Sequence, residues 1–171
     1  MNSFFDHIIE KQGCVILDGA LATELEKRGA NLNHALWSAK LLIENPALIK
    51  QVHLDYLHAG ADIITTATYQ ASFSGFAKQG YSKKETEDLM QLSLSIAKDA
   101  INEFLLASPA SNKKVPLVAA SIGPYGAALA DGSEYKGNYN VSLETLMEFH
   151  KHRLDLLARS NANILAFETI P

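Results

Sequence analysis

The sequence predicts an α/β fold in which short parallel strands alternate with helices, and within that class it favours a (β/α)8 barrel, the TIM barrel. The first observation is a set of four short apolar runs: Cys14 to Asp18, Asp62 to Thr66, Val115 to Ser121, and Asn163 to Glu168. Each run is apolar nearly throughout and does not alternate with polar residues. This pattern is typical of strands that are covered on both faces of a parallel sheet.

The second observation is that capped helical segments lie between the runs. Asn45 before Pro46 is an N-cap with proline at the first helical position, and Gly60 ends that helix. The segment Ser82 to Glu85 forms a capping box that opens a long helix, and Ser142 caps a third helix. Apolar residues at helical spacing follow each start: Ile49, Val52, Tyr56 and Ala59; then Leu89, Leu92, Ile96, Ala100 and Phe104 as a buried stripe; then Leu143, Leu146, Met147, His150, Leu154 and Leu157. The polar segment Ser108 to Lys114 is predicted to be a loop.

Repeated strand–helix units form either an open doubly wound sheet or a (β/α)8 barrel. The first turn after a strand, residues 18–22, lacks the G-x-G-x-x-G pattern of dinucleotide-binding folds. In a barrel, polar residues at the carboxyl ends of all strands meet at one mouth, and here those ends offer Asp18, residues 65–70, Ser121 and Glu168. A whole barrel needs about 250 residues. We therefore expect residues 1–171 to form one domain that supplies the first four βα units, the N-terminal half of a barrel.

The composition argues against some classes of partner and indicates a cellular compartment. The chain has 171 residues, 47% hydrophobic and 20% charged, with a net charge of −4, and its Lys and Arg residues form no stripe. These values argue against nucleic acid and against a polybasic contact with a membrane. Residues 1–12 mix charged and apolar side chains, unlike a signal peptide or a membrane span. The single cysteine, Cys14, excludes an intrachain disulfide and fits a cytoplasmic location.

Two acidic residues at strand ends are candidates for binding a ligand. Asp18 ends the first run and is followed by Gly19 and Ala20, where a helix begins and backbone N–H groups can approach an anion. Asp18 then fixes a carboxylate-binding corner, or it only caps the helix. Glu168 ends a run too apolar to solvate it, so it needs a cationic or hydrogen-bonding partner, either a substrate ammonium group or a structural Arg or Lys. Together the two ends could hold both poles of an amino acid.

The segment from Gly123 to Asn140 is long, rich in glycine and aromatic, which is typical of functional loops. Tyr125, Glu134, Tyr135 and Tyr139 could line a pocket and attract a cation through their rings and the carboxylate. The alternative is a surface excursion that folds on itself.

No metal site is predicted within this sequence. Cys14 precedes Asp18 by four residues, which places it roughly 13 Å below the mouth at the rise of a strand, so we expect an inert core thiol. His150 and His152 are two residues apart on a helix and point to different sides, and the other histidines lack ligand spacing.

Several motifs together resemble one family. They are Leu17 to Leu25, Leu36 to Lys40, His53 to Tyr56, Thr68 to Ala71, Ser121 to Ala127 and Asp131 to Tyr135. The combination is similar to the homocysteine S-methyltransferases over essentially the whole chain, with the bacterial enzymes that use S-methylmethionine as the nearest branch.

The resemblance implies a zinc-dependent (β/α)8 barrel that transfers a methyl group from a sulfonium donor to homocysteine and yields methionine. Zinc would lower the thiol pKa so that the thiolate attacks the methyl carbon. On this sequence, the resemblance implies that Asp18 with the backbone of Gly19 and Ala20 receives the carboxylate of homocysteine. It also implies that Glu168 binds the ammonium group and that Thr66 borders the site. Weaker candidates for the donor side are Tyr69, Gln70, Tyr125, Glu134 and Tyr135.

The family's zinc is held by three cysteines of the second half of the barrel, so the resemblance places the ligands beyond residue 171. We expect these residues to be inactive alone and to self-associate through open barrel edges. The donor stays open between S-methylmethionine, S-adenosylmethionine and betaine. Two other functions also stay open: a non-catalytic half-barrel that binds an amino acid or pairs with a partner, and an unrelated barrel lyase that uses Asp18 and Glu168 as acid and base.

Overall fold

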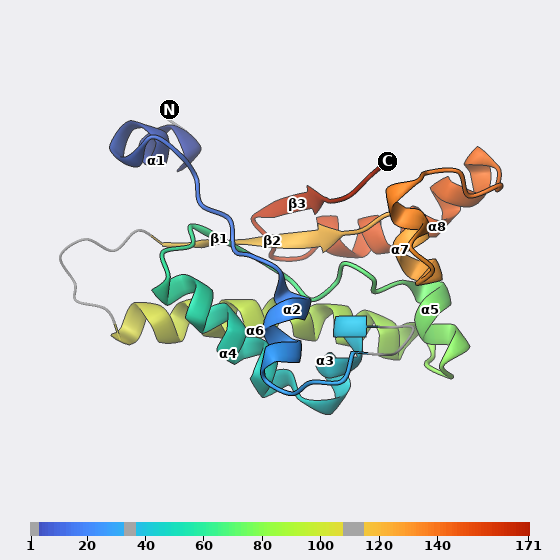
Figure 1. The fold of residues 1–171 in the computed structure, drawn as a ribbon, viewed down its shortest axis with the longest axis horizontal. Coiled ribbons are helices and arrows are strands. Elements are labelled where there is room, and N and C mark those ends of the chain that lie inside the picture. The colour runs from blue at the N-terminus through green and yellow to red at the C-terminus, as the bar shows by residue number, and fades with distance from the viewer. Residues whose placement is uncertain (1–3, 33–36, 108–114) are drawn as a thin grey trace.

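The computed structural model describes residues 4–32, 37–107 and 115–171, and it shows helices alternating with strands (Figure 1). The helices are α1 (Phe4–Gln12), α2 (Leu21–Lys27), α3 (Leu41–Glu44), α4 (Pro46–His58), α5 (Phe73–Lys78), α6 (Lys83–Ala107), α7 (Tyr125–Leu129) and α8 (Leu143–Ala158). Two short 3-10 turns are η1 (Trp37–Lys40) and η3 (Ser133–Tyr135). The strands are β1 (Ile63–Thr65), β2 (Leu117–Ile122) and β3 (Ile164–Phe167). The predicted loop from Ser108 to Lys114 lies outside the described residues.

The three strands form one parallel sheet in the order β1-β2-β3, as the apolar runs predicted. Its register pairs Thr65 with Ala119 and Ser121 with Ala166. The predicted first strand is not a full strand, because the run from Cys14 to Asp18 joins the sheet only through a single parallel bridge between Leu17 and Ile63. That bridge still fixes the chain beside β1, so four consecutive segments lie in sequence order.

The helices cover one face of the sheet. Ile64, Val118 and Ala120, which alternate with the pocket-facing residues of their strands, pack with Leu57 of α4 and Ala97 of α6 in one buried cluster. Figure 1 shows α4 and α6 running along the same side of the sheet. Sequential order with helices on one face is the arrangement of a barrel, whereas a doubly wound sheet carries helices on both faces.

The helix starts that the sequence predicts are confirmed. Asn45 accepts a hydrogen bond from the backbone N–H of Leu48, and Ser142 accepts one from that of Thr145. The capping box of α6 is complete, because Ser82 and Glu85 bond each other in both directions. These bonds satisfy backbone donors that a helix leaves unpaired at its first turn.

Burial differs from the predictions at several positions. Leu92 was predicted to lie in the buried stripe of α6 but is exposed, since the buried face of that helix follows Met90, Leu94 and Ala97. Cys14 was predicted to be a core thiol but is exposed. Leu17 beside it is 56% exposed, because nothing among the described residues covers that side of the sheet. Among those residues, no helix is both long and apolar enough to cross a bilayer.

Candidate functional site

A pocket of about 240 Å³ opens at the carboxyl ends of the strands, where the chain also enters α2. Its walls come from five separate stretches of the sequence that the fold brings together. They are Gly19, Ala20, Leu21, Ala22 and Thr23; Thr65, Thr66, Ala67 and Tyr69; Ser121; Tyr135; and Glu168 and Thr169. The parallel register gathers these residues, because the ends of parallel strands meet at the same edge of a sheet.

Asp18 lies directly behind this wall and is held by Thr65. Its carboxylate accepts hydrogen bonds from the backbone N–H of Thr65 at 2.7 Å and from the Thr65 hydroxyl at 3.0 Å. The pKa of Asp18 is raised to about 6, chiefly by burial; the Thr65 hydrogen bonds lower it and the charge of Glu168 adds to the rise. The alternative that Asp18 only caps the next helix is wrong, since Ala20 is the N-cap of α2 and no side chain caps it.

Gly19 and Ala20 form the part of the wall where backbone approaches the pocket. A Cβ atom at Gly19 would lie 2.7 Å from the hydroxyl oxygen of Tyr56, which is closer than van der Waals contact allows. The same Tyr56 hydroxyl donates to the carbonyl oxygen of Ala20 at 3.4 Å. An alanine here would therefore force the Tyr56 ring or the turn to move.

Glu168 faces the pocket from the end of β3. Its backbone N–H donates to the carbonyl oxygen of Ile122 at 3.2 Å, which continues the pairing of β3 with β2. Its Oε1 atom is buried and has no hydrogen-bond partner. A buried carboxylate oxygen without a partner is costly, so this atom is suited to a ligand that carries donors.

Thr66 borders the pocket, but its hydroxyl is engaged elsewhere. The Thr68 hydroxyl donates to the carbonyl oxygen of Ser121 at 2.7 Å, so the 2.6 Å bond between Thr66 and Thr68 must be donated by Thr66. The Thr66 oxygen in turn accepts from the backbone N–H of Ser121 at 3.0 Å. This ring of three hydrogen bonds locks the end of β1 to the end of β2.

The structure places the candidates for the donor side in different positions relative to the pocket. Tyr69 and Tyr135 line the pocket, and Tyr135 is 74% exposed at its rim. Burial raises the pKa of Tyr69, and the nearby charge of Glu134 adds to this. Glu134 and Gln70 are buried behind the wall, each with a side-chain oxygen that has no partner.

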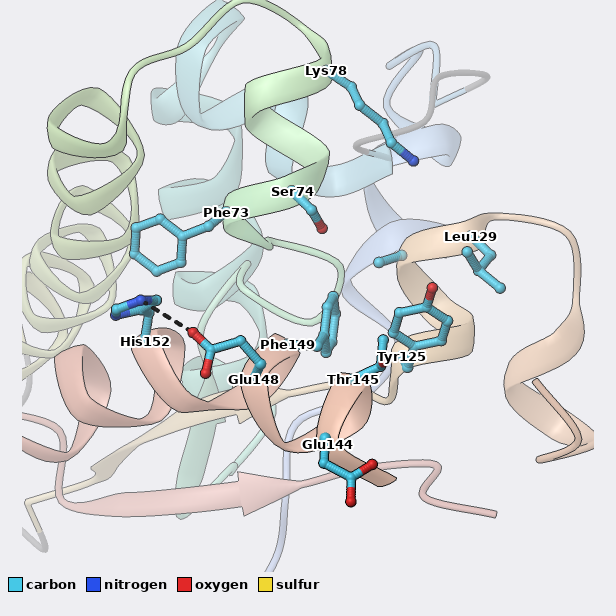
Figure 2. Close-up of a pocket in the computed structure, with 11 residues that line it drawn as sticks. Phe73, Ser74, Lys78, Tyr125, Leu129, Glu144, Thr145, Glu148, Phe149 and His152 are labelled. Atoms are coloured by element: carbon cyan, nitrogen blue, oxygen red, sulfur yellow. Dashed lines mark ion pairs between the residues drawn. The ribbon is translucent and has the colours of Figure 1, made fainter. Parts of the chain in front are cut away.

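Tyr125 belongs to a different pocket, of about 650 Å³, which lies between α5, α7 and α8 (Figure 2). In Figure 2, Phe73 of α5 lies across from Phe149 of α8, and Tyr125 of α7 closes a third side. Glu148 and His152 form an ion pair of 3.6 Å on the same helix. The structure therefore does not bring Tyr125 together with Glu168.

Arg153 is the residue at this end of the sheet that sequence reasoning missed. It is 1% exposed, and its guanidinium donates to the carbonyl oxygens of Ala71 at 3.0 Å and Gly123 at 2.6 Å. A weaker bond of 3.3 Å reaches the carbonyl oxygen of Tyr69. Arg153 thus ties α8 to the two loops that follow β1 and β2. An arginine among the apolar positions of a predicted helix was the available signal.

No group of three His, Cys, Asp or Glu residues that could hold a metal ion occurs in the part of the chain that the structure describes. The exposed Cys14 lies outside the pocket wall. The residues present here do not fit a zinc site.

The chain matches the sequence model of the family described as homocysteine S-methyltransferase over residues 15–171. The chain belongs to this family. It is 55% identical over 166 residues to homocysteine S-methyltransferase YbgG of Bacillus subtilis, covering 96% of this chain and 53% of that protein. It is 53% identical to a selenocysteine Se-methyltransferase of Brassica oleracea, covering 95% of this chain and 49% of that protein.

A solved structure of a family member has the same fold. The chain matches the crystal structure of the homocysteine methyltransferase MmuM from Escherichia coli in its metallated form with a TM-score of 0.89 and 47% identity. The match covers 99% of this chain and 58% of MmuM. The chain thus spans about half the length of the relatives that it matches, and one relative of known structure binds a metal.

Proposed function

We propose that the protein to which these residues belong transfers a methyl group from a sulfonium donor, S-methylmethionine or S-adenosylmethionine, to the thiol of homocysteine. Residues 1–171 supply the pocket that binds the amino-acid end of homocysteine. The observation that carries this proposal is the buried, unpartnered Oε1 atom of Glu168 in a pocket whose other wall is the backbone of Gly19 and Ala20. The proposed reaction is inferred from the membership of the homocysteine S-methyltransferase family.

The charges in the pocket favour a zwitterion in one orientation. Asp18 and Glu168 are close enough for their negative charges to interact, and this interaction contributes to the raised pKa of Asp18. An ammonium group beside Glu168 would relieve that repulsion. The substrate carboxylate would then lie at the turn of Gly19 and Ala20, where Asp18 holds the backbone in place through Thr65.

We also propose the overall fold and the location of the zinc ligands. Sequential parallel strands with helices on one face support a (β/α)8 barrel of which these residues form the first part. The described residues do not fit a metal site. As the family resemblance implies, the ligands of a zinc ion would lie beyond residue 171. The residues of this chain bind and orient the acceptor amino acid, and alone they would be inactive.

The methyl donor would approach from the side of Tyr69 and Tyr135, which line the pocket. Aromatic rings attract sulfonium and ammonium cations through the negative face of the π system. Gln70 and Glu134, which are buried, would support this wall without lining it. Tyr125 would have at most an indirect role because it lines the other pocket, between α5, α7 and α8.

The Brassica relative favours a second acceptor. A pocket that binds the ammonium and carboxylate groups does not by itself distinguish a thiol from a selenol, and this relative is a selenocysteine Se-methyltransferase. Selenocysteine is therefore a second candidate substrate.

The test is an activity assay on the full-length protein that contains these residues. The protein is incubated with zinc, homocysteine and either donor, and the methionine formed from homocysteine is measured. Formation of methionine from homocysteine supports the proposal, and S-methylmethionine and S-adenosylmethionine are distinguished by their relative kcat/KM. Absence of methyl transfer with intact amino-acid binding would favour the non-catalytic half-barrel. Elimination chemistry without a donor would favour the lyase.

The Glu168→Gln variant keeps the size of the side chain and removes its charge. Loss of a charged hydrogen bond to the ammonium group should raise the KM for homocysteine by about tenfold to hundredfold. Glu103→Gln is the matched control, because the Glu103 side chain is 55% exposed and pairs with Lys50 on the helical face. If both substitutions change the KM for homocysteine equally, Glu168 does not bind the substrate.

A further inference from the structure

Ser121 carries a hydroxyl that the family resemblance does not assign. The residue is 2% exposed, and its Oγ atom is buried with no hydrogen-bond partner. Ser121 also lines the pocket that holds Glu168. A buried hydroxyl without a partner at the wall of a pocket is suited to meet a ligand.

The backbone of Ser121 is fixed, which leaves only its side chain available. Its N–H donates to the Thr66 hydroxyl at 3.0 Å, and its carbonyl oxygen accepts from the Thr68 hydroxyl at 2.7 Å. The direction of these bonds commits the hydroxyl protons of both threonines to the ring. Of the three hydroxyls, only that of Ser121 therefore has both its proton and its two lone pairs free for a ligand.

The register places this hydroxyl beside Glu168. Ser121 pairs with Ala166, so its side chain and that of Ala166 lie on the same face of the sheet. Glu168 follows two residues after Ala166, and its backbone N–H still bonds to Ile122. Neighbouring strands lie about 4.8 Å apart, and β2 and β3 are neighbours. The segment that carries Asp18 lies on the far side of β1, about 10 Å from β2. Ser121 is therefore closer to the strand of Glu168 than to the segment of Asp18.

We propose that the Ser121 hydroxyl and Glu168 Oε1 together bind the ammonium group of the acceptor amino acid, with Ser121 accepting one of its hydrogen bonds. The substrate carboxylate lies across the pocket, at the turn of Gly19 and Ala20. Ser121 is then a specificity-determining residue that selects acceptors with a primary amine. This inference rests on the proposed function and names the group that recognises one end of the substrate.

The test measures dissociation constants by calorimetry on the full-length protein and on its Ser121→Ala variant. Three thiols serve as probes: homocysteine, 4-mercaptobutanoate, which lacks the amine, and 3-mercaptopropylamine, which lacks the carboxylate. Ser121→Ala should weaken homocysteine and 3-mercaptopropylamine by about tenfold or more, the value of one hydrogen bond to a charged group. It should leave 4-mercaptobutanoate unchanged.

Ser133→Ala is the matched control. Its Oγ atom is also buried without a partner, but Ser133 does not line the pocket. This substitution should leave all three affinities unchanged, and circular dichroism of both variants checks that they are folded.

Each remaining outcome overturns the assignment. If Ser121→Ala weakens 4-mercaptobutanoate but not 3-mercaptopropylamine, the hydroxyl binds the carboxylate. If it weakens all three thiols equally, or none, Ser121 has no role in recognising the amine. If the unmodified protein binds no homocysteine, the proposed function itself fails, which is a different result from a silent Ser121 in a protein that binds it.

Discussion

Arg153 Nη2 on α8 donates a hydrogen bond of 2.6 Å to the carbonyl oxygen of Gly123, at the point where the chain leaves β2. The opposite nitrogen reaches the carbonyl oxygen of Ala71, in the loop after β1. The same guanidinium lies 5.2 Å from the ring centre of Phe149. One buried side chain therefore fastens two loops at the mouth of the pocket to a helix.

Arg153→Met should destabilise the protein strongly, because it leaves buried carbonyl groups without donors. We expect the free energy of unfolding to fall by about 3 kcal/mol or more, as measured by urea denaturation. Arg159→Met, on the exposed end of the same helix, should change it by less than about 0.5 kcal/mol. A loss at Arg153 no larger than that control would show that these hydrogen bonds do not stabilise the loops.

Asp18→Asn should change how stability depends on pH. The pKa of Asp18 is raised to about 6 in the folded protein, so the folded state favours the protonated carboxyl group. The resulting contribution to the free energy of unfolding is fully present below about pH 4 and is lost as the pH rises through about 6. The free energy of unfolding of the unmodified protein, minus that of the variant, should therefore fall by roughly 2 kcal/mol between pH 4 and pH 7. Urea denaturation at several pH values measures this difference, and a constant difference would contradict the raised pKa.

His53→Leu should stabilise the protein. His53 is fully buried, neither ring nitrogen has a hydrogen-bond partner, and burial lowers its pKa to about 4. Replacing an unpartnered polar ring with an apolar side chain should raise the free energy of unfolding by about 1 kcal/mol at pH 7. The gain should grow by a further ~2 kcal/mol at pH 5, because stability tied to a lowered histidine pKa is lost as the pH falls below about 6.5.

The control for that substitution is His58→Leu on the same helix, where the side chain is exposed. If both variants respond to pH alike, the buried histidine is not the cause.

Gly19→Ala should weaken homocysteine binding through a clash with Tyr56. The added Cβ would lie 2.7 Å from the Tyr56 hydroxyl, so either that ring or the turn must move. We expect a loss of about 1–3 kcal/mol in stability together with a higher KM. Combining Gly19→Ala with Tyr56→Leu removes the clash and should recover most of the affinity, whereas failure of this rescue would show that the backbone at Gly19 matters for another reason.

The sequence was sufficient for the helices and for most of the sheet. Asn45, Ser82 and Ser142 were predicted as helix caps, and each makes its capping bond, because capping depends on residues within one turn. The strands β1, β2 and β3 were predicted from apolar runs that are covered by helices. The run at residues 14–18 was predicted as a strand in the same way, but it forms only one bridge at the open edge of the sheet.

Side-chain partners could not be predicted in the same way. Arg153 contacts residues more than 80 positions earlier in the chain, so no local pattern indicates which carbonyl groups it meets. Tyr125 and Tyr135 occur in one segment of sequence, yet they line different pockets because α7 turns the first toward α8.

The sequence by itself determined which residues stand at the ends of the strands, since Asp18 and Glu168 each end an apolar run. Strand order and register, which depend on contacts between distant segments, decided that Glu168 lines the pocket and that Asp18 lies behind its wall. The tertiary structure alone also decided which polar atoms are left for a ligand. Hydrogen bonds across the sheet consume the hydroxyl protons of Thr66 and Thr68 and leave Ser121 Oγ and Glu168 Oε1 without partners.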